Sequence, residues 1–352
     1  MTEKQTEDPA FLEGAARFLD LNKWSEFILK WASAVEAYGT PRSFVESTAY
    51  KTGIVPFNGK EFELNFFLST NHDQRRALMA QQKPYQNQRP TVEYGLRMDY
   101  ANCFLCQNLA QSIDALTNPE GIANNVIYDV GNFVIMPNRY PSQYGHSLFV
   151  LKNHDDTSGR VPPIQEPENR TTRYTPEQGK TRGNIVDYNH LEALMATCDR
   201  LHLVAVRNHV LDGMSIPAHD HEHVFPEDLP TFSLAGRLAG DIVAAEGGHP
   251  FYSPADTPFD TRVIKGTRGE IAGFGSFVME RMERDDQVFT FAYHNGALFI
   301  SPRDKEAVND RRIQIGAGIP LHFSDTESPE FFDRVNRLVP MKGSYDWKKY
   351  VE

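Results

Sequence analysis

Large apolar residues near the start of the chain recur at helical intervals. Over residues 10–38 they are three, four or seven positions apart, which predicts an amphipathic helix built on Phe11, Phe18, Leu21, Trp24, Phe27, Ile28 and Trp31. A polar stretch follows, and the turn-rich segment 83–95 predicts a boundary. Residues 1–95 are therefore expected to form a helical N-terminal lead-in that packs on the core.

The pattern changes to that of β-strands from residue 125 onward. Two β-rich runs flank a D-V-G-N turn within residues 124–138, and a third run covers residues 146–153. Residues 155–187 are polar, interrupted by proline and glycine, and longer than an ordinary connection. This insert is expected to be a lid, an interface arm or a disordered segment, and an interface arm would imply a homodimer.

A helix is predicted over residues 188–201, because its apolar residues fall on one face. Cys198 lies on that face, so we interpret it as core packing. A strand is expected over residues 202–210, and the histidine-rich stretch after the next turn is expected to be another strand.

Beyond residue 230 the pattern again places helices around a hairpin. A short helix is predicted over residues 236–248, and a late helix over residues 328–339. Between them, residues 288–303 read as a hairpin that turns at His294-Asn295-Gly296. The whole chain is therefore predicted to be α+β, with a mostly antiparallel sheet.

Composition limits the classes of partner and the cellular location. Lys and Arg number 36 against 47 Asp and Glu, so the net charge is −11, which argues against a nucleic-acid partner. No stretch approaches the roughly 20 apolar residues of a membrane span, and the start of the chain lacks the features of a secretory signal. We therefore expect a cytoplasmic protein with no membrane partner.

Three histidines occur at two-residue spacing in the stretch His219-Asp220-His221-Glu222-His223. In a strand these imidazoles share one face, about 6–7 Å apart, while the two acids share the other face. The spacing suits one metal ligand beside one free nucleophile better than three ligands of one metal. Two alternatives are a solvated edge strand that is polar by accident and a cupin-like metal site, which would lack its expected acid.

Two of the three cysteines, Cys103 and Cys106, stand at C-x-x-C spacing. They could be buried apolar residues or a redox pair, although no βαβ unit follows them. Together with two distant imidazoles they would form a tetrahedral zinc site, for which His154 and His219 are candidates. His146 would then not be needed as a zinc ligand, and we interpret it as a polar residue at the start of a strand whose hydrogen bonds are satisfied.

The ordered segments CFLCQN, NFVIMPNRYPSQYGHSLFVLKNHDD and RNHVLDGMSIPAHDHEHVF resemble the motifs of the histidine-triad superfamily. In detail they look like the motifs of its galactose-1-phosphate uridylyltransferase-like branch, which includes dinucleoside polyphosphate phosphorylases and GDP-hexose phosphorylases. The resemblance implies a histidine-triad-like antiparallel sheet with flanking helices. It also implies a catalytic domain over residues 96–230 and a degenerate second half over residues 231–352.

The same resemblance implies roles for individual residues. His221 matches the central nucleophile of the triad, which accepts a nucleoside monophosphate covalently, and His223 is expected near the phosphate or leaving group. A structural zinc ion is implied at Cys103, Cys106, His154 and His219. Residues that match phosphate- and nucleotide-binding positions are Asn208, Ser215, Asn138 and Arg139, and Ser215 is also assigned to catalysis.

The resemblance therefore predicts a nucleotidyltransferase or phosphorylase that acts through a covalent nucleotidyl-histidine. Its donor would be a nucleotide sugar or a dinucleotide, and its acceptor phosphate or a sugar phosphate. Neutral imidazole is a suitable nucleophile near pH 7, and transfer then needs in-line placement and donors to the charged oxygens. Many transferases of this branch carry Gln where this chain has His223, so hydrolysis by water is an alternative.

Two further alternatives remain open from the sequence. In one, the register shifts, so that His221 binds zinc and His223 is the nucleophile. In the other, the protein is a non-catalytic nucleotide-binding module that keeps the fold and the zinc but has lost turnover.

Overall fold

A computed structural model of the chain describes 15 stretches of it. They are residues 9–37, 40, 42–46, 48–57, 60–69, 126–151, 187–208, 221–232, 242–243, 251–254, 259–285, 287–303, 314–316, 319–322 and 343–351.

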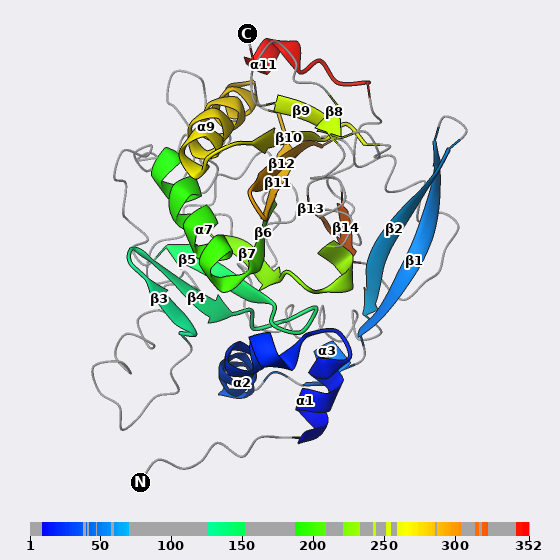
Figure 1. Ribbon diagram of the computed structural model, residues 1–352, viewed down its shortest axis with the longest axis vertical. Helices are drawn as coiled ribbons and strands as arrows, with labels where there is room; N and C mark the ends of the chain where they lie inside the picture. Colours follow the sequence, from blue (N-terminus) through cyan, green and yellow to red (C-terminus); the bar gives the residue numbers. More distant parts are fainter. Residues whose placement is uncertain are drawn as a thin grey trace, which may run out of the picture.

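An antiparallel sheet of ten strands forms the centre of this described part (Figure 1). Its spatial order is β3-β4-β5-β7-β6-β11-β12-β10-β9-β8. The strands are β3 (Tyr128–Val130), β4 (Phe133–Pro137), β5 (Ser147–Leu151), β6 (Leu203–Asn208), β7 (His221–Pro226), β8 (Ile242–Val243), β9 (Phe251–Pro254), β10 (Arg262–Lys265), β11 (Phe289–His294) and β12 (Ala297–Pro302). The α+β class with a large antiparallel sheet is thus confirmed.

The strand order reads the same outward from the contact between β6 and β11. On one side the chain order is β3, β4, β5, a helix, β6 and β7, and β7 lies between β5 and β6. On the other side it is β8, β9, β10, a helix, β11 and β12, and β12 lies between β10 and β11. The two helices are α7 (Tyr188–Leu201) and α9 (Arg268–Arg284). The central contact is antiparallel, with Asn208 opposite Thr290.

Helices α7 and α9 pack beside each other on one face of the sheet (Figure 1). Asp187 caps α7 by accepting a hydrogen bond from the His190 backbone N–H, and Cys198 is buried on the inner face of the helix as predicted. Helix α9 approaches closely at Gly275, where an added Cβ would lie 2.5 Å from Leu298 of β12. Helix α9 was not predicted from the sequence.

The opposite face of the sheet is covered by other elements. Strand β13 (Gln314–Gly316) packs against β6 and β11, and β14 (Ile319–His322) packs against β2 and the 3₁₀ turn η3 (Pro230–Phe232). The chain ends near α11 (Lys348–Val351), which packs on α9. No helix among the described residues is both long and apolar enough to cross a membrane.

The N-terminal region contains more than the single predicted helix. Helix α1 (Pro9–Ala16) and helix α2 (Leu21–Ala37) are separated where Asp20 accepts a hydrogen bond from the Asn22 backbone N–H and restarts the helix. The short α3 (Ser43–Glu46) and a hairpin of β1 (Thr48–Phe57) and β2 (Lys60–Ser69) follow. The hairpin occupies part of the stretch that the sequence analysis described only as polar.

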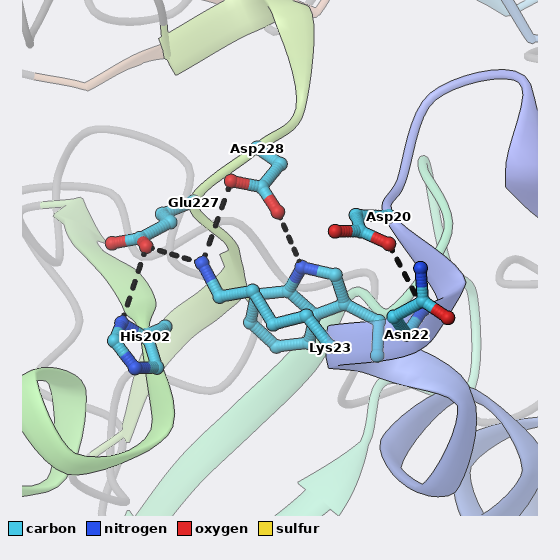
Figure 2. A network of polar contacts seen from close by, with 7 residues as sticks. Asp20, Asn22, Lys23, His202, Glu227 and Asp228 are labelled. Atoms are coloured by element: carbon cyan, nitrogen blue, oxygen red, sulfur yellow. Dashed lines mark hydrogen bonds and ion pairs between the residues drawn. The ribbon is translucent and has the colours of Figure 1, made fainter.

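Hydrogen bonds and an ion pair join helix α2 to the turn that follows β7 (Figure 2). Lys23 Nζ donates to Glu227 Oε1 at 2.5 Å and lies 3.5 Å from Asp228 Oδ1. Trp24 Nε1 donates to Asp228 Oδ2 at 2.6 Å. Glu227 also contacts His202, the residue in left-handed conformation that ends α7.

Most of the other predicted elements occur where the patterns place them. These are β3 and β4, β5, α7, β6 and the β11–β12 hairpin, which turns at Asn295 and Gly296. The helix predicted over residues 236–248 is wrong at Ile242–Val243, which pair with β9 as strand β8. The late helix predicted over residues 328–339 lies outside the described residues, as does the segment 83–95.

Candidate functional site

Strand β7 places two of the three histidines at the centre of one half of the sheet. It lies between β5 and β6, with His221 opposite Val150 and His223 opposite both Leu148 and Val206. His221 is buried, His223 is half-buried, and their ring centroids are 5.8 Å apart. A solvated edge strand is therefore excluded, and the two rings share one face as predicted.

A third imidazole, that of His146, contacts the ring of His223. Nε2 of His146 lies 2.8 Å from Nδ1 of His223, and the His146 ring stacks on Phe225 with centroids 4.4 Å apart. The Ser142 backbone N–H donates to Nδ1 of His146 at 3.0 Å. Because Nδ1 of His146 accepts from Ser142, a neutral His146 ring carries its proton on Nε2. Of the two nitrogens near Nε2, those of His223 and Asn138, only Nδ1 of His223 can accept this proton.

This assignment fixes the tautomer of His223 as well. Since Nδ1 of His223 accepts a hydrogen bond, the proton of its neutral ring is on Nε2. His223 can therefore donate that proton to an oxygen on the histidine face of the sheet. His146 is a hydrogen-bonded polar residue at the start of a strand, as predicted, but its contact with His223 was not predicted. Its position at the start of the strand beside β7 was the available signal.

The loop before β5 carries Asn138 and Arg139, two of the four residues assigned to nucleotide binding. Asn138 Nδ2 lies 3.0 Å from His146 Nε2, and its Oδ1 accepts a hydrogen bond from the Tyr140 backbone N–H. Because an amide nitrogen only donates, the first contact is not a hydrogen bond when His146 Nε2 carries the proton. Asn138 is thus beside the histidine pair. The Arg139 guanidinium lies over the ring of Tyr140, 5.9 Å from its centroid.

Residues from the N-terminal region hold this loop in place. Trp31 of α2, fully buried, donates from Nε1 to the His146 carbonyl at 2.9 Å. Thr40 Oγ1 donates to the Arg139 carbonyl, and Tyr50 of β1 donates from its hydroxyl to Gln143 Oε1 at 3.0 Å. The lead-in is therefore part of the frame of the site.

The opposite face of β7 carries a buried ionic network. Glu222 is fully buried, its Oε1 accepts from Arg207 Nη1 at 2.5 Å, and its Oε2 lies 2.9 Å from His190 Nε2. Burial alone would raise the pKa of Glu222, but His190 and Arg207 outweigh that effect and lower it to about 2. Side-chain alternation predicted that Glu222 lies on this face, but neither partner was predicted.

The remaining site residues are only partly described. Asn208 ends β6, and continuing the register from Val206 and His223 by two residues places it opposite His221. Ser215, His219, Cys103, Cys106 and His154 lie outside the described residues. Within the described stretches, no group of three or more His, Cys, Asp or Glu residues is arranged to hold a metal ion.

Comparison with known proteins gives likeness in structure only. No protein-family model matches the chain, and no curated protein matches it significantly. The structure of yeast Ap4A phosphorylase Apa2 in complex with AMP is similar with a TM-score of 0.51 and 12% identity, over 93% of this chain and 99% of that one. Another structure of yeast Ap4A phosphorylase Apa2 gives a TM-score of 0.51 and 10% identity, over 95% and 100% of the two chains.

At these identities the likeness shows the fold. It confirms at that level the resemblance drawn from the sequence motifs, because the branch in question includes dinucleoside polyphosphate phosphorylases.

Proposed function

We propose that this protein is a nucleotidyltransferase or phosphorylase that transfers a nucleoside monophosphate through a covalent intermediate on His221. The observation that carries the proposal is the set of three neighbouring imidazoles, in which the hydrogen bond from His146 orients His223 beside the His221 ring. The fold of yeast Ap4A phosphorylase supports the same class of reaction. Dinucleoside polyphosphates such as Ap4A are therefore the first donors to test, followed by nucleotide sugars.

In the first step, a ring nitrogen of His221 attacks the α-phosphorus of the donor. A P–N bond forms, the P–O bond to the leaving group breaks, and the leaving group departs with that electron pair. His223 can donate its Nε2 proton to a phosphoryl or leaving-group oxygen, because its Nδ1 already accepts from His146.

In the second step, an oxygen of phosphate or of a sugar phosphate attacks the same phosphorus. The P–N bond breaks and its electrons return to the His221 ring, which restores the free imidazole. We assign Asn208, Ser215, Asn138 and Arg139 to contacts with the nucleotide and its phosphates. For Asn138 the support is its position beside His146.

Hydrolysis of the same intermediate is the second candidate function. It is favoured by His223, since histidine at the third triad position is typical of hydrolase-like members of the resembled superfamily. In that case water replaces phosphate as the acceptor, while His221, His223 and His146 keep their roles.

We further propose a structural zinc ion held by Cys103, Cys106, His154 and His219. Such an ion, when bound, would stabilise the chain just before β7. We also retain the division into residues 1–95, 96–230 and 231–352, with the last part as a degenerate second histidine-triad-like half. The repeated strand order about β6 and β11 supports this division. A cytoplasmic location is retained as a proposal.

The test is to incubate the protein with dinucleoside polyphosphates and nucleotide sugars, with and without phosphate, and to identify the products. We expect release of a nucleoside diphosphate when phosphate is the acceptor. Release of the monophosphate independently of phosphate would instead indicate the hydrolase. Nucleotide binding without turnover of any donor would contradict both enzymatic functions and indicate a binding module.

A further inference from the structure

The buried carboxylate of Glu222 stands on β7 between the two site histidines. Because side chains alternate along a strand, Glu222 points toward α7 while His221 and His223 point to the opposite face. It is 0% exposed and paired at both oxygens. A charged residue here is unusual, since this face of the sheet otherwise packs on the apolar side of α7.

The partners of Glu222 come from two other elements that frame the site. Arg207 lies on β6 and is followed directly by Asn208, the residue opposite His221 by register. His190 lies in the first turn of α7, where its backbone N–H is also fixed by the helix cap Asp187. The three side chains therefore link β7, β6 and the start of α7 at one point.

Stability alone does not account for such a network. Well-packed apolar residues of similar size can often replace a buried ion pair without loss of stability. What an ion pair adds is geometric definition, because a one-residue slip of β7 would turn Glu222 away from Arg207 and both histidines to the helix side. The network therefore selects the register in which the two imidazoles face the site.

We propose that Glu222, Arg207 and His190 are positioning residues that fix the orientation of His221 and His223 from the opposite face of the sheet. The inference rests on the proposed function for its effect on turnover. The orientation of His221 and His223 by this network does not depend on the proposed function. Neither Glu222 nor its partners contact the substrate in this proposal.

The experiment replaces the network by apolar residues of similar size, in the triple variant Glu222→Met, Arg207→Met and His190→Phe. We expect the triple variant to unfold within a few degrees of the wild type, because no unpaired charge is left buried. Its kcat should fall about 10- to 100-fold with little change in KM, because the reacting groups are misplaced. Retention of wild-type kcat would overturn the proposal.

The second readout does not depend on activity. Ring ¹H–¹⁵N spectra report the tautomer of each histidine, and the signal of His223 is assigned by its loss in His223→Asn. We expect the wild-type signal of His223 to show a single Nε2–H tautomer, and that of the triple variant to broaden or split. A wild-type that turns over no donor would contradict the proposed function, while this spectrum would still decide the positioning role.

Two further variants complete the test. Val224→Ala is the matched control, because Val224 is the next buried residue on the same face of β7. It should lower stability but leave kcat and the His223 signal unchanged. Glu222→Gln keeps the shape but leaves the Arg207 charge without its partner, so it should be less stable than the wild type and is measured at a temperature where it is folded. We expect a reduced kcat and an altered His223 signal. A wild-type kcat together with an unchanged His223 signal in Glu222→Gln would overturn the proposal.

Discussion

Nε2 of His146 and Nδ1 of His223 are 2.8 Å apart, so the ring that precedes β5 fixes the proton position of the ring on β7. The Ser142 backbone N–H sets the direction of this bond, because it occupies the other nitrogen of His146. His223 is thereby held as a hydrogen-bond donor toward the site.

Replacing His146 by Phe removes the donor while keeping a ring of similar shape. The tautomer of His223 is then no longer fixed, and we expect kcat to fall about 10- to 100-fold with little change in KM. Steady-state kinetics with the best donor measure this effect. The control is His202→Asn, because His202 is exposed at the end of α7 and its left-handed backbone tolerates Asn. Unchanged kcat in His146→Phe would contradict the role given to the hydrogen bond.

Replacing His221 by Asn should abolish turnover and covalent labelling, because the attacking nitrogen is lost. The wild-type protein incubated with a labelled donor should retain a label that is labile in acid and stable in base, as a phosphoramidate is. His223→Asn should lower kcat but still accept the label. If His223→Asn is unlabelled and His221→Asn remains active, the nucleophile is one triad position further on, and the zinc assignment moves with it.

The stability of the fold should decrease in acid through Glu222. Its pKa is about 2 in the folded protein against a reference value of 4.5, so between these values the unfolded chain binds more protons at this carboxyl. The stabilisation is present above about pH 5 and is lost as the pH falls toward 2, with a size on the order of 3 kcal/mol. The groups that face Glu222 are Arg207 on β6, and His190 and Cys198 on α7.

Urea unfolding of the wild type and Glu222→Gln between pH 3 and pH 7 measures this contribution. The difference in unfolding free energy should be largest at pH 7 and should shrink at pH 3. A difference that stays constant with pH would show that the Glu222 carboxylate does not titrate between the two states in this range.

Zinc binding and burial should determine which of the three cysteine thiols can be alkylated. Burial, Asp199 and Glu222 raise the pKa of the Cys198 thiol well above its usual range, so this thiol should resist alkylation in the folded protein. Metal analysis should find about one zinc per chain. A chelator should then expose two reactive thiols, Cys103 and Cys106, and only unfolding should expose Cys198. Cys103→Ser should lose the metal and fold poorly, and a metal-free folded wild type with two reactive thiols would exclude this site.

Local patterns identified the elements that carry the site. Helix α7 was predicted with its bounds, because its apolar residues share one face, and β7 was recognised because its histidines alternate with acids. The hairpin of β1 and β2 was missed although Asn58-Gly59 stands between its strands, a dipeptide typical of two-residue turns. The short strand Ile242–Val243 lies in a sequence that also suits a helix, and only pairing with β9 decides between them.

The partners of the site residues could not be read from the sequence. His146 and His223 are 77 positions apart, and Arg207 and Glu222 are brought together by strand register. Side-chain alternation predicted which face Glu222 occupies, but the buried cation opposite it depends on how β6 and β7 are paired. Chemistry that depends on such long-range contacts requires the three-dimensional arrangement.

The hydrogen bond from Trp31 to the His146 carbonyl bears on how far the chain can be shortened. A truncated protein that begins at residue 96 would contain every proposed catalytic side chain and every proposed zinc ligand. It would nevertheless lack the donors of Trp31, Thr40 and Tyr50 that hold the loop before β5, and the apolar surface around Tyr144 would face water. Trp31, Thr40 and Tyr50 thus belong to the frame of the proposed site, and a minimal active fragment must include them.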